Sequence, residues 1–175
     1  MSDNRIEGYA RGLFEIARAE GVVDAVEDEL FQFARSYESN DALRNALTDE
    51  QIPAARRQAI VEDLLGAQAS TTTMQLVSMV IGAGRGRDLP AIVDNLVARA
   101  SATKQLEVAE VRTAVPLTTN QQVRIKAALV SATGKQLNMK VVVDPSILGG
   151  VVATVGDTVI DGSVRTRIDQ LKSRL

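Results

Sequence analysis

One stretch near the end of the chain combines residue types that could do chemistry. Residues 144–171 read DPSILGGVVATVGDTVIDGSVRTRIDQL, with a double glycine, a Gly-Asp pair and an Asp-Gly-Ser before a helical pattern. Glycines beside the start of a helix can hold a phosphate, and a serine near an aspartate can act as a nucleophile. The stretch is therefore either an active site or a structural motif.

The composition of the 175-residue chain removes most enzymatic interpretations. There is no cysteine and no histidine, so thiolate chemistry, the commonest general base and the commonest metal ligand are all missing. A phosphate-binding loop needs Gly-Lys-Ser/Thr or a strand followed by GxGxxG and a helix. Gly134-Lys135 is followed by Gln136, and the glycines of 82–86 follow a helical pattern. We therefore predict no catalytic residue, no cofactor and no metal site.

Folding accounts for every unusual residue of the stretch. Asp144-Pro145 is typical of a turn, the double glycine allows the backbone to bend into a strand, and Gly-Asp is typical of a hairpin turn. Asp or Ser before a helical pattern is typical of a helix cap. The residues to which we assign these structural roles are Gly149, Gly150, Gly156, Asp157, Asp161 and Ser163.

The first 104 residues contain six apolar patterns with the spacing of helices. They cover 6–17, 23–37, 43–47, 53–65, 71–81 and 90–100. Asn4 with Glu7 resembles a capping box for the first, Asp41 caps the third, and Ser70 or Thr71 begins the fifth. Short connections between six helices predict an antiparallel bundle.

The pattern changes after Lys104, where apolar and polar residues alternate. Strands are predicted at 106–115 and 139–144, and a hairpin at 149–161. Thr118 with Gln121 predicts a capped helix that ends at Gly134. Val164, Ile168, Leu171 and Leu175 lie on one face of a last helix. We therefore expect an α+β protein, with a six-helix bundle at 1–104 followed by a small β-α-β-β-α domain at 105–175.

The distribution of charge and hydropathy indicates whether the chain binds nucleic acid or enters a membrane. Residues 1–104 carry 11 basic and 16 acidic side chains, and residues 105–175 carry 9 and 6. The arginine pairs at 56–57 and 85–87 could contact phosphates, but the pI near 5.3 and the lack of aromatics after Tyr37 favour solvated surface charges. The uncharged stretch at 67–84 is interrupted by polar residues, and the first residues are acidic where a signal peptide is basic. These features predict a soluble cytoplasmic chain.

The first and fifth helices have more apolar surface than a one-sided surface helix needs. On a helical wheel the apolar and small residues cover roughly 260° of the first helix and roughly 220° of the fifth. One interpretation is that both helices lie deep in the bundle. The other is that Gly8 and Gly12, one turn apart, leave a shallow groove beside the fifth helix in which an amphipathic helix of a partner docks.

The chain also resembles a known family. The segments YARGLFEIARAEG, AGRGRDLPAIVDNL, AEVRTAVPLT and VVVDPSILGGVVATVGDTVIDGSVRTRIDQL are similar, in order and spacing, to the delta subunit of bacterial F-type ATP synthase, which is equivalent to the mitochondrial oligomycin-sensitivity-conferring protein. The resemblance covers nearly the whole chain. Gly86 departs from the family pattern, where a larger apolar residue often follows the Gly-Arg pair, so the path from the fifth helix to the sixth is left open.

The resemblance implies a non-catalytic stator subunit that couples proton-driven rotation to ATP synthesis. Residues 1–104 would bind an N-terminal helix of the alpha subunits of the catalytic head, and residues 105–175 the C-terminal end of the b-subunit stalk. One copy per complex would lie at the cytoplasmic face of the bacterial inner (plasma) membrane without inserting into it. The docking residues carried over by position are Gly8, Tyr9, Gly12, Leu13, Ile16, Met74, Val77, Val80 and Ile81. A nucleic-acid-binding module is the alternative.

Overall fold

The computed structural model describes residues 2–66 and 68–162. The chain divides into two compact units, Met1–Ala100 and Ser101–Leu175. The composition predicted a boundary between two units after Lys104, which is four residues beyond Ala100. Each unit has its own buried core.

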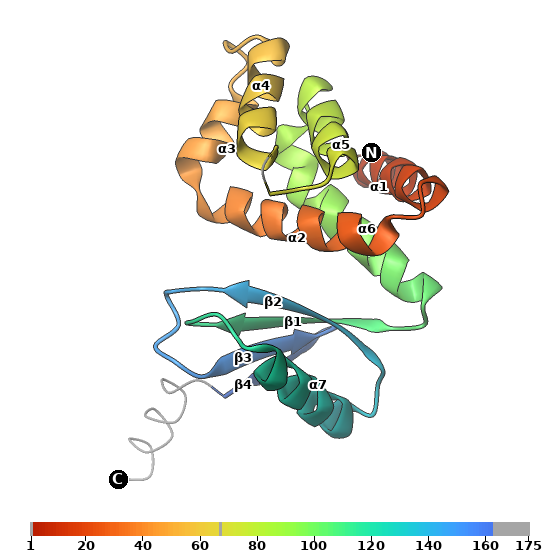
Figure 1. The fold of residues 1–175 in the computed structure, drawn as a ribbon, viewed down its shortest axis with the longest axis vertical. Helices are drawn as coiled ribbons and strands as arrows, with labels where there is room; N and C mark the ends of the chain where they lie inside the picture. The colour runs from red at the N-terminus through yellow and green to blue at the C-terminus, as the bar shows by residue number, and fades with distance from the viewer. Residues whose placement is uncertain (1, 67, 163–175) are drawn as a thin grey trace. The chain divides into compact units, whose positions relative to one another are not determined.

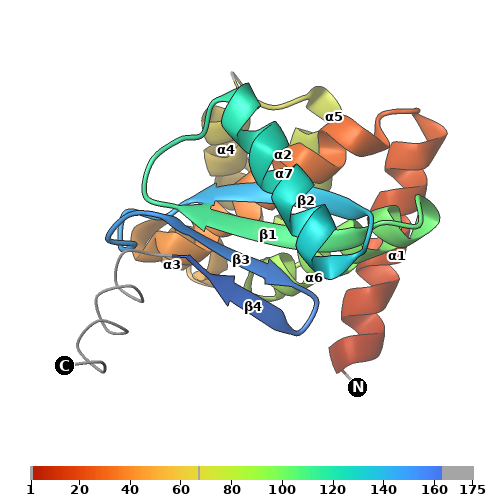
Figure 2. The same cartoon turned by 90° about the horizontal axis from the view of Figure 1, so that it is seen from below.

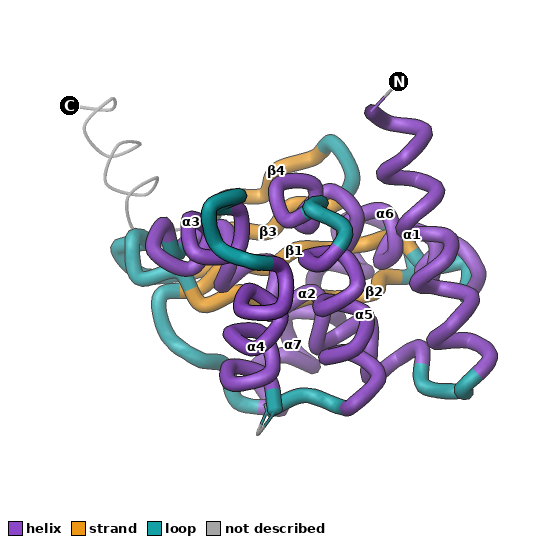
Figure 3. Tube along the Cα trace, turned by 90° about the horizontal axis from the view of Figure 1, so that it is seen from above, coloured by secondary structure: helices purple, strands orange, loops and turns teal. Residues whose placement is uncertain are grey.

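Six α-helices and one 3-10 turn, counted over the described residues, run up to the start of the sheet (Figure 1). They are α1 (Ser2–Ala19), α2 (Val23–Ser39), α3 (Asp41–Thr48), α4 (Ala54–Leu65), α5 (Thr71–Gly82), η1 (Gly86–Asp88) and α6 (Leu89–Thr103). Short loops, drawn in teal in Figure 3, join consecutive helices. The sequence therefore predicts the existence and order of these helices correctly.

The ends of the helices differ in part from the predicted caps. Ser70 caps α5, because its side chain accepts a hydrogen bond from the Thr73 amide at 3.3 Å. The prediction for α3 is wrong by one residue: Asn40 is the cap and accepts from the Leu43 amide at 3.0 Å, whereas Asp41 is already helical. The predicted capping box of Asn4 is also wrong, since α1 begins at Ser2.

The core of the first unit is formed by apolar side chains from all six helices. Burial of one large aliphatic or aromatic side chain stabilises a fold by roughly 1.5–3 kcal/mol. The largest apolar side chains that are almost completely buried are Leu13, Val26, Leu30, Phe31, Tyr37, Leu47, Ile81, Leu89, Ile92 and Leu96. This set is large enough to hold the helices together.

The second unit is built on a four-stranded sheet within the described residues. Its elements are β1 (Glu107–Thr113), α7 (Thr119–Thr133), β2 (Leu137–Val143), β3 (Val151–Val155) and β4 (Thr158–Asp161). The strand order is β2-β1-β3-β4, with β1 parallel to β2 and the other pairs antiparallel. A parallel pair needs a crossover, and α7 supplies it.

The helix α7 covers one face of this sheet (Figures 1 and 2). Its N-terminal capping box of Thr118 and Gln121 and its left-handed C-cap at Gly134 are both confirmed. Leu129 of α7 packs on a core of small and branched side chains from β1, β2 and β3. The members of this core are Ala109, Val111, Leu137, Ala153 and Val155.

The predicted strand count of this unit needs a correction. The hairpin supplies two strands, so the described order is β-α-β-β-β where β-α-β-β was expected before the last helix. The turn at Gly156-Asp157 joins β3 to β4, as predicted, and Gly156 has φ +56°. The last helix, predicted from Val164 to Leu175, and its proposed cap Ser163 lie outside the described residues.

Candidate helix-docking groove

The helix α1 carries apolar residues on both its inner and its outer face. Leu13 is 1% exposed, whereas Ile16, three residues later, is 39% exposed. Gly8 and Gly12 are both exposed, and a Cβ atom built on either would meet nothing within 4 Å. The outer face of α1 is therefore a strip of bare backbone flanked by apolar side chains.

An open groove of about 430 Å³ runs along this face and reaches Met79 of α5. At the end of α1 the Glu20 carboxylate accepts a hydrogen bond of 2.6 Å from the Thr72 hydroxyl in the first turn of α5. Because Thr72 lies at the end of α1 and Met79 beside its middle, the two helices run antiparallel. The residues that line this α1 groove are Arg5, Gly8, Tyr9, Gly12, Leu13, Ile16 and Met79.

The structure brings together the predicted docking residues of α1 but not those of α5. All five of the α1 residues line the groove. Val77, Val80 and Ile81 are 0% exposed and belong to the core of the unit, which corrects their assignment as direct contacts. Met74 is half-buried and does not line the groove.

Two lining residues were not predicted. Met79 is 43% exposed and is the α5 side chain that lines the groove. In the sequence, Met79 was one of several apolar residues around an uncharged helix. It lies 200° from Val77 and from Ile81 on the helical wheel, and this separation could have distinguished a groove residue from the core residues. Arg5 was missed because only apolar and small residues were considered for the groove.

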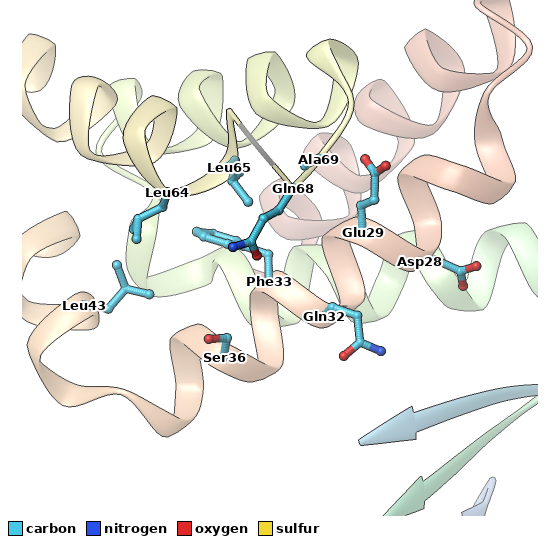
Figure 4. Close-up of a pocket in the computed structure, with 10 residues that line it drawn as sticks. All are labelled: Asp28, Glu29, Gln32, Phe33, Ser36, Leu43, Leu64, Leu65, Gln68 and Ala69. Atoms are coloured by element: carbon cyan, nitrogen blue, oxygen red, sulfur yellow. The ribbon is translucent and has the colours of Figure 1, made fainter. Parts of the chain in front are cut away.

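A second cavity, of about 520 Å³, lies between α2, α3 and α4 (Figure 4). Figure 4 shows Leu43 and Leu64 on one side of it and Asp28 and Glu29 on the other. Phe33 contributes buried apolar surface. The full lining is Asp28, Glu29, Gln32, Phe33, Ser36, Leu43, Leu64, Leu65, Gln68 and Ala69.

Glu29 is engaged in a structural contact at this cavity. Its carboxylate accepts hydrogen bonds from the amide and the hydroxyl of Ser70, at 2.9 and 2.7 Å. Burial raises the pKa of the Glu29 carboxyl, but hydrogen bonds from Thr73 and Ser70 outweigh burial and leave the pKa below its usual value. The carboxylate thus ties α2 to the first turn of α5.

The stretch that could have been an active site forms turns and strands as far as it is described. The Asp144 carboxylate accepts hydrogen bonds from the amide and hydroxyl of Ser146, at 2.9 and 2.6 Å, and these bonds lower its pKa. Gly149 and Gly150 have φ of +110° and +85°, a region that favours glycine. Asp161 is the last residue of β4.

Of the arginines considered for phosphate contacts, Arg56 and Arg87 are exposed, whereas Arg57 and Arg85 are buried or half-buried. Arg57 is buried, and one of its guanidinium nitrogens lies 3.5 Å from the Leu47 carbonyl oxygen. Arg85 forms an ion pair of 3.3 Å with Asp88. Over residues 2–66 and 68–162, no three acidic side chains gather closely enough to hold a metal ion. In the same part of the chain, none of the helices has the length and apolar character that crossing a bilayer requires.

Comparison with known proteins identifies related chains. Residues 6–175 match the family model described as ATP synthase delta (OSCP) subunit. The chain is 43% identical over 159 residues to the ATP synthase subunit delta of Streptomyces avermitilis, covering 91% of this chain and 58% of that protein. It is 33% identical to the ATP synthase subunit delta of Desulforudis audaxviator, covering 95% of this chain and 92% of that protein.

A further relative and a solved structure extend this result. The ATP synthase subunit delta of Nocardia farcinica is 40% identical over all 175 residues, which span 65% of its length. The chain thus spans less than two thirds of the Streptomyces and Nocardia proteins. Its fold is similar to that of a chain in the mitochondrial ATP synthase hexamer of Toxoplasma gondii, with a TM-score of 0.57 at 23% identity, covering 97% of this chain and 96% of that chain.

Proposed function

The chain belongs to the ATP synthase delta (OSCP) subunit family, and from this membership we propose that it is a non-catalytic stator subunit of an F-type ATP synthase. It links the alpha subunits of the catalytic head to the b-subunit peripheral stalk, so that proton-driven rotation is coupled to ATP synthesis. The relatives reported above are all ATP synthase subunits. No specific observation favours the nucleic-acid-binding alternative.

Each unit has its own role in this proposal. The helices of the first unit form a six-helix bundle, which holds an N-terminal helix of an alpha subunit. The second unit holds the C-terminal end of the b-subunit stalk. One copy acts in each complex, at the cytoplasmic face of the bacterial plasma membrane, where the complex itself holds it.

The exposed α1 groove is the observation that carries this proposal. A stator must resist the torque of a turning rotor, so its contacts must dissociate slowly, and slow dissociation comes from buried apolar surface more than from charges at the rim. The strip formed by Gly8 and Gly12 lets the backbone of a partner helix approach closely. Ile16 and Met79 supply exposed apolar side chains beside it.

Replacement of Gly12 by leucine tests the groove. The leucine side chain occupies the space of the docked helix, so binding to the purified catalytic head should be largely lost. The melting temperature should stay unchanged or rise, because leucine favours helix over glycine by up to roughly 1 kcal/mol. Ala59→Leu, at an exposed position of α4 that does not line the groove, is the control and should bind normally.

The outcome distinguishes the candidate functions. A lower melting temperature with normal head binding would show that Gly12 packs inside the unit and that the groove is not the docking site.

Head binding by the stator should change little between 0.1 and 0.3 M salt, whereas binding to phosphates would weaken steeply. Co-purification from membranes, with partners identified by mass, tests the association with the stalk.

A further inference from the structure

Arg5 is the charged residue in the lining of an otherwise apolar groove. Its side chain is exposed, and no ion pair joins it to a side chain of residues 4–66 or 68–162. Other arginines of the same unit are engaged: Arg18 pairs with Glu15 and Arg99 with Glu7, each at 3.4 Å. The guanidinium of Arg5 is therefore available to a group that enters the groove.

The spacing along α1 relates this charge to the glycine strip. Arg5, Gly8 and Gly12 are separated by three and then four residues, so they lie along one face of the helix. The Cα atoms of Arg5 and Gly12 are about 10 Å apart at 1.5 Å per residue. A docked helix therefore meets the charge and the bare backbone about two turns apart.

We propose that Arg5 binds a carboxylate of the docked alpha-subunit helix and that this pair sets the register of that helix in the α1 groove. The inference rests on the proposed function and names the chemistry of its partner. The docked segment is an amphipathic helix with a large apolar side chain over Gly12 and an Asp or Glu about two turns away, against Arg5.

Two physical arguments support a carboxylate at this point. Apolar contact is non-directional, so the remaining lining allows a docked helix to slide by one turn at little change in free energy. A guanidinium group binds a carboxylate through two parallel hydrogen bonds, so it selects a negatively charged group and also fixes the position of that group. One turn beyond Ile16, the last α1 residue of the groove lining, the Glu20 carboxylate would repel a carboxylate and so disfavours a register displaced toward that end.

The experiment uses the full chain and the purified catalytic head. Arg5→Glu should weaken head binding on the order of tenfold, because attraction becomes repulsion at the interface. The matched control is Arg11→Glu, which makes the same change of charge at an exposed position of α1 that does not line the groove. It should change binding less than twofold. The affinity of Arg5→Gln for the head should fall between those of Arg5→Glu and Arg11→Glu.

A charge exchange identifies the partner group. Each Asp or Glu in the N-terminal helix of the alpha subunits is replaced by lysine in turn, and the heads are tested against the wild-type chain and Arg5→Glu. One replacement should weaken binding to the wild type and restore binding to Arg5→Glu. Failure of every replacement to restore binding would overturn the inference.

The same measurements separate this inference from the proposed function. If the wild-type chain does not bind the head, or if Gly12→Leu binds as well as wild type, the docking function itself is wrong. If Gly12→Leu abolishes binding while Arg5→Glu and Arg11→Glu bind alike, the docking function stands and the role of Arg5 is refuted.

Discussion

The hydroxyl of Tyr37 donates a hydrogen bond of 2.8 Å to the backbone carbonyl of Gly86, across 49 residues of sequence. Tyr37 lies on α2 and is almost completely buried, and Gly86 begins the 3-10 turn between α5 and α6. Burial raises the pKa of the Tyr37 phenol, against a smaller lowering by Arg44 and Arg87, so the group remains a donor at physiological pH. The bond fixes the path from the fifth helix to the sixth, which the sequence left open.

Removal of this hydroxyl should destabilise the first unit. Tyr37→Phe leaves the Gly86 carbonyl without its partner, which should lower the free energy of unfolding by about 1–2 kcal/mol. Urea unfolding followed by circular dichroism measures the change. Tyr9→Phe is the control, because Tyr9 is only half-buried in the α1 groove, and it should change stability by less than about 0.5 kcal/mol. Equal stability of the two variants would contradict this role of Tyr37.

A side chain at position 86 should also be destabilising. A Cβ atom there would lie 3.1 Å from Ile81 Cδ1 and 3.2 Å from the Leu47 carbonyl oxygen. Gly86→Ala should therefore cost about 1–3 kcal/mol through overpacking. The matched replacement Gly12→Ala meets open space and should be neutral or stabilising by up to roughly 1 kcal/mol. A gain of stability in both variants would show that the turn has room to relax.

Local signals in the sequence were sufficient for most elements of the fold. The capping box of Thr118 with Gln121 depends on two side chains and the backbone between them, so no tertiary contact was needed to predict it. The same is true of the hairpin turn at Gly156. Asn40 and Asp41 show the limit of such signals, because both residue types cap helices and only the backbone conformation distinguishes them.

The candidate site was predicted only where the sequence shows which face of a helix points outward. Gly8 and Gly12 of α1 have no side chain to bury, and both are exposed. On α5 no charged residue marks the outer face, so Val77 and Met79 could not be told apart as core and surface without the packing of the neighbouring helices. Arg5 lies three residues before Gly8 on the same face of α1, so the helical spacing could have placed it in the groove if charged residues had been considered.

Gln105 offers a prediction about the connection after α6. It has φ +57°, a left-handed conformation in which glycine is strongly preferred. The Leu106 amide donates to the Ser101 carbonyl at 2.8 Å and the Gln105 amide to the Ala102 carbonyl at 3.1 Å, which is the hydrogen-bond pattern of a Schellman motif. Gln105→Gly should therefore raise the free energy of unfolding by about 0.5–1 kcal/mol, through the relief of backbone strain.

Thermal unfolding of three chains tests this effect. Gln105→Ala keeps the Cβ atom and should gain nothing, so it is the control for Gln105→Gly. If alanine stabilises as much as glycine, the gain comes from the lost side chain and not from the backbone conformation.

Glu29 should make the stability of the first unit depend on pH. Because its pKa is lower in the folded chain than the usual 4.5, the stability that it contributes is complete above that value. It is lost as the pH falls through the lower pKa of the folded state. Glu29→Gln weakens the hydrogen bonds to Ser70 and should cost about 1 kcal/mol at pH 7, a value that allows for partial exposure.

The difference between wild type and Glu29→Gln is the quantity to follow with pH. It should be largest near pH 7 and should shrink as the wild-type carboxylate takes up its proton toward pH 3, because both chains then carry a neutral group at position 29. Glu62→Gln, at an exposed position of α4, should show no such change with pH. A difference that stayed constant from pH 7 to pH 3 would mean that the shape of the side chain, and not its charge, holds the first turn of α5 against α2.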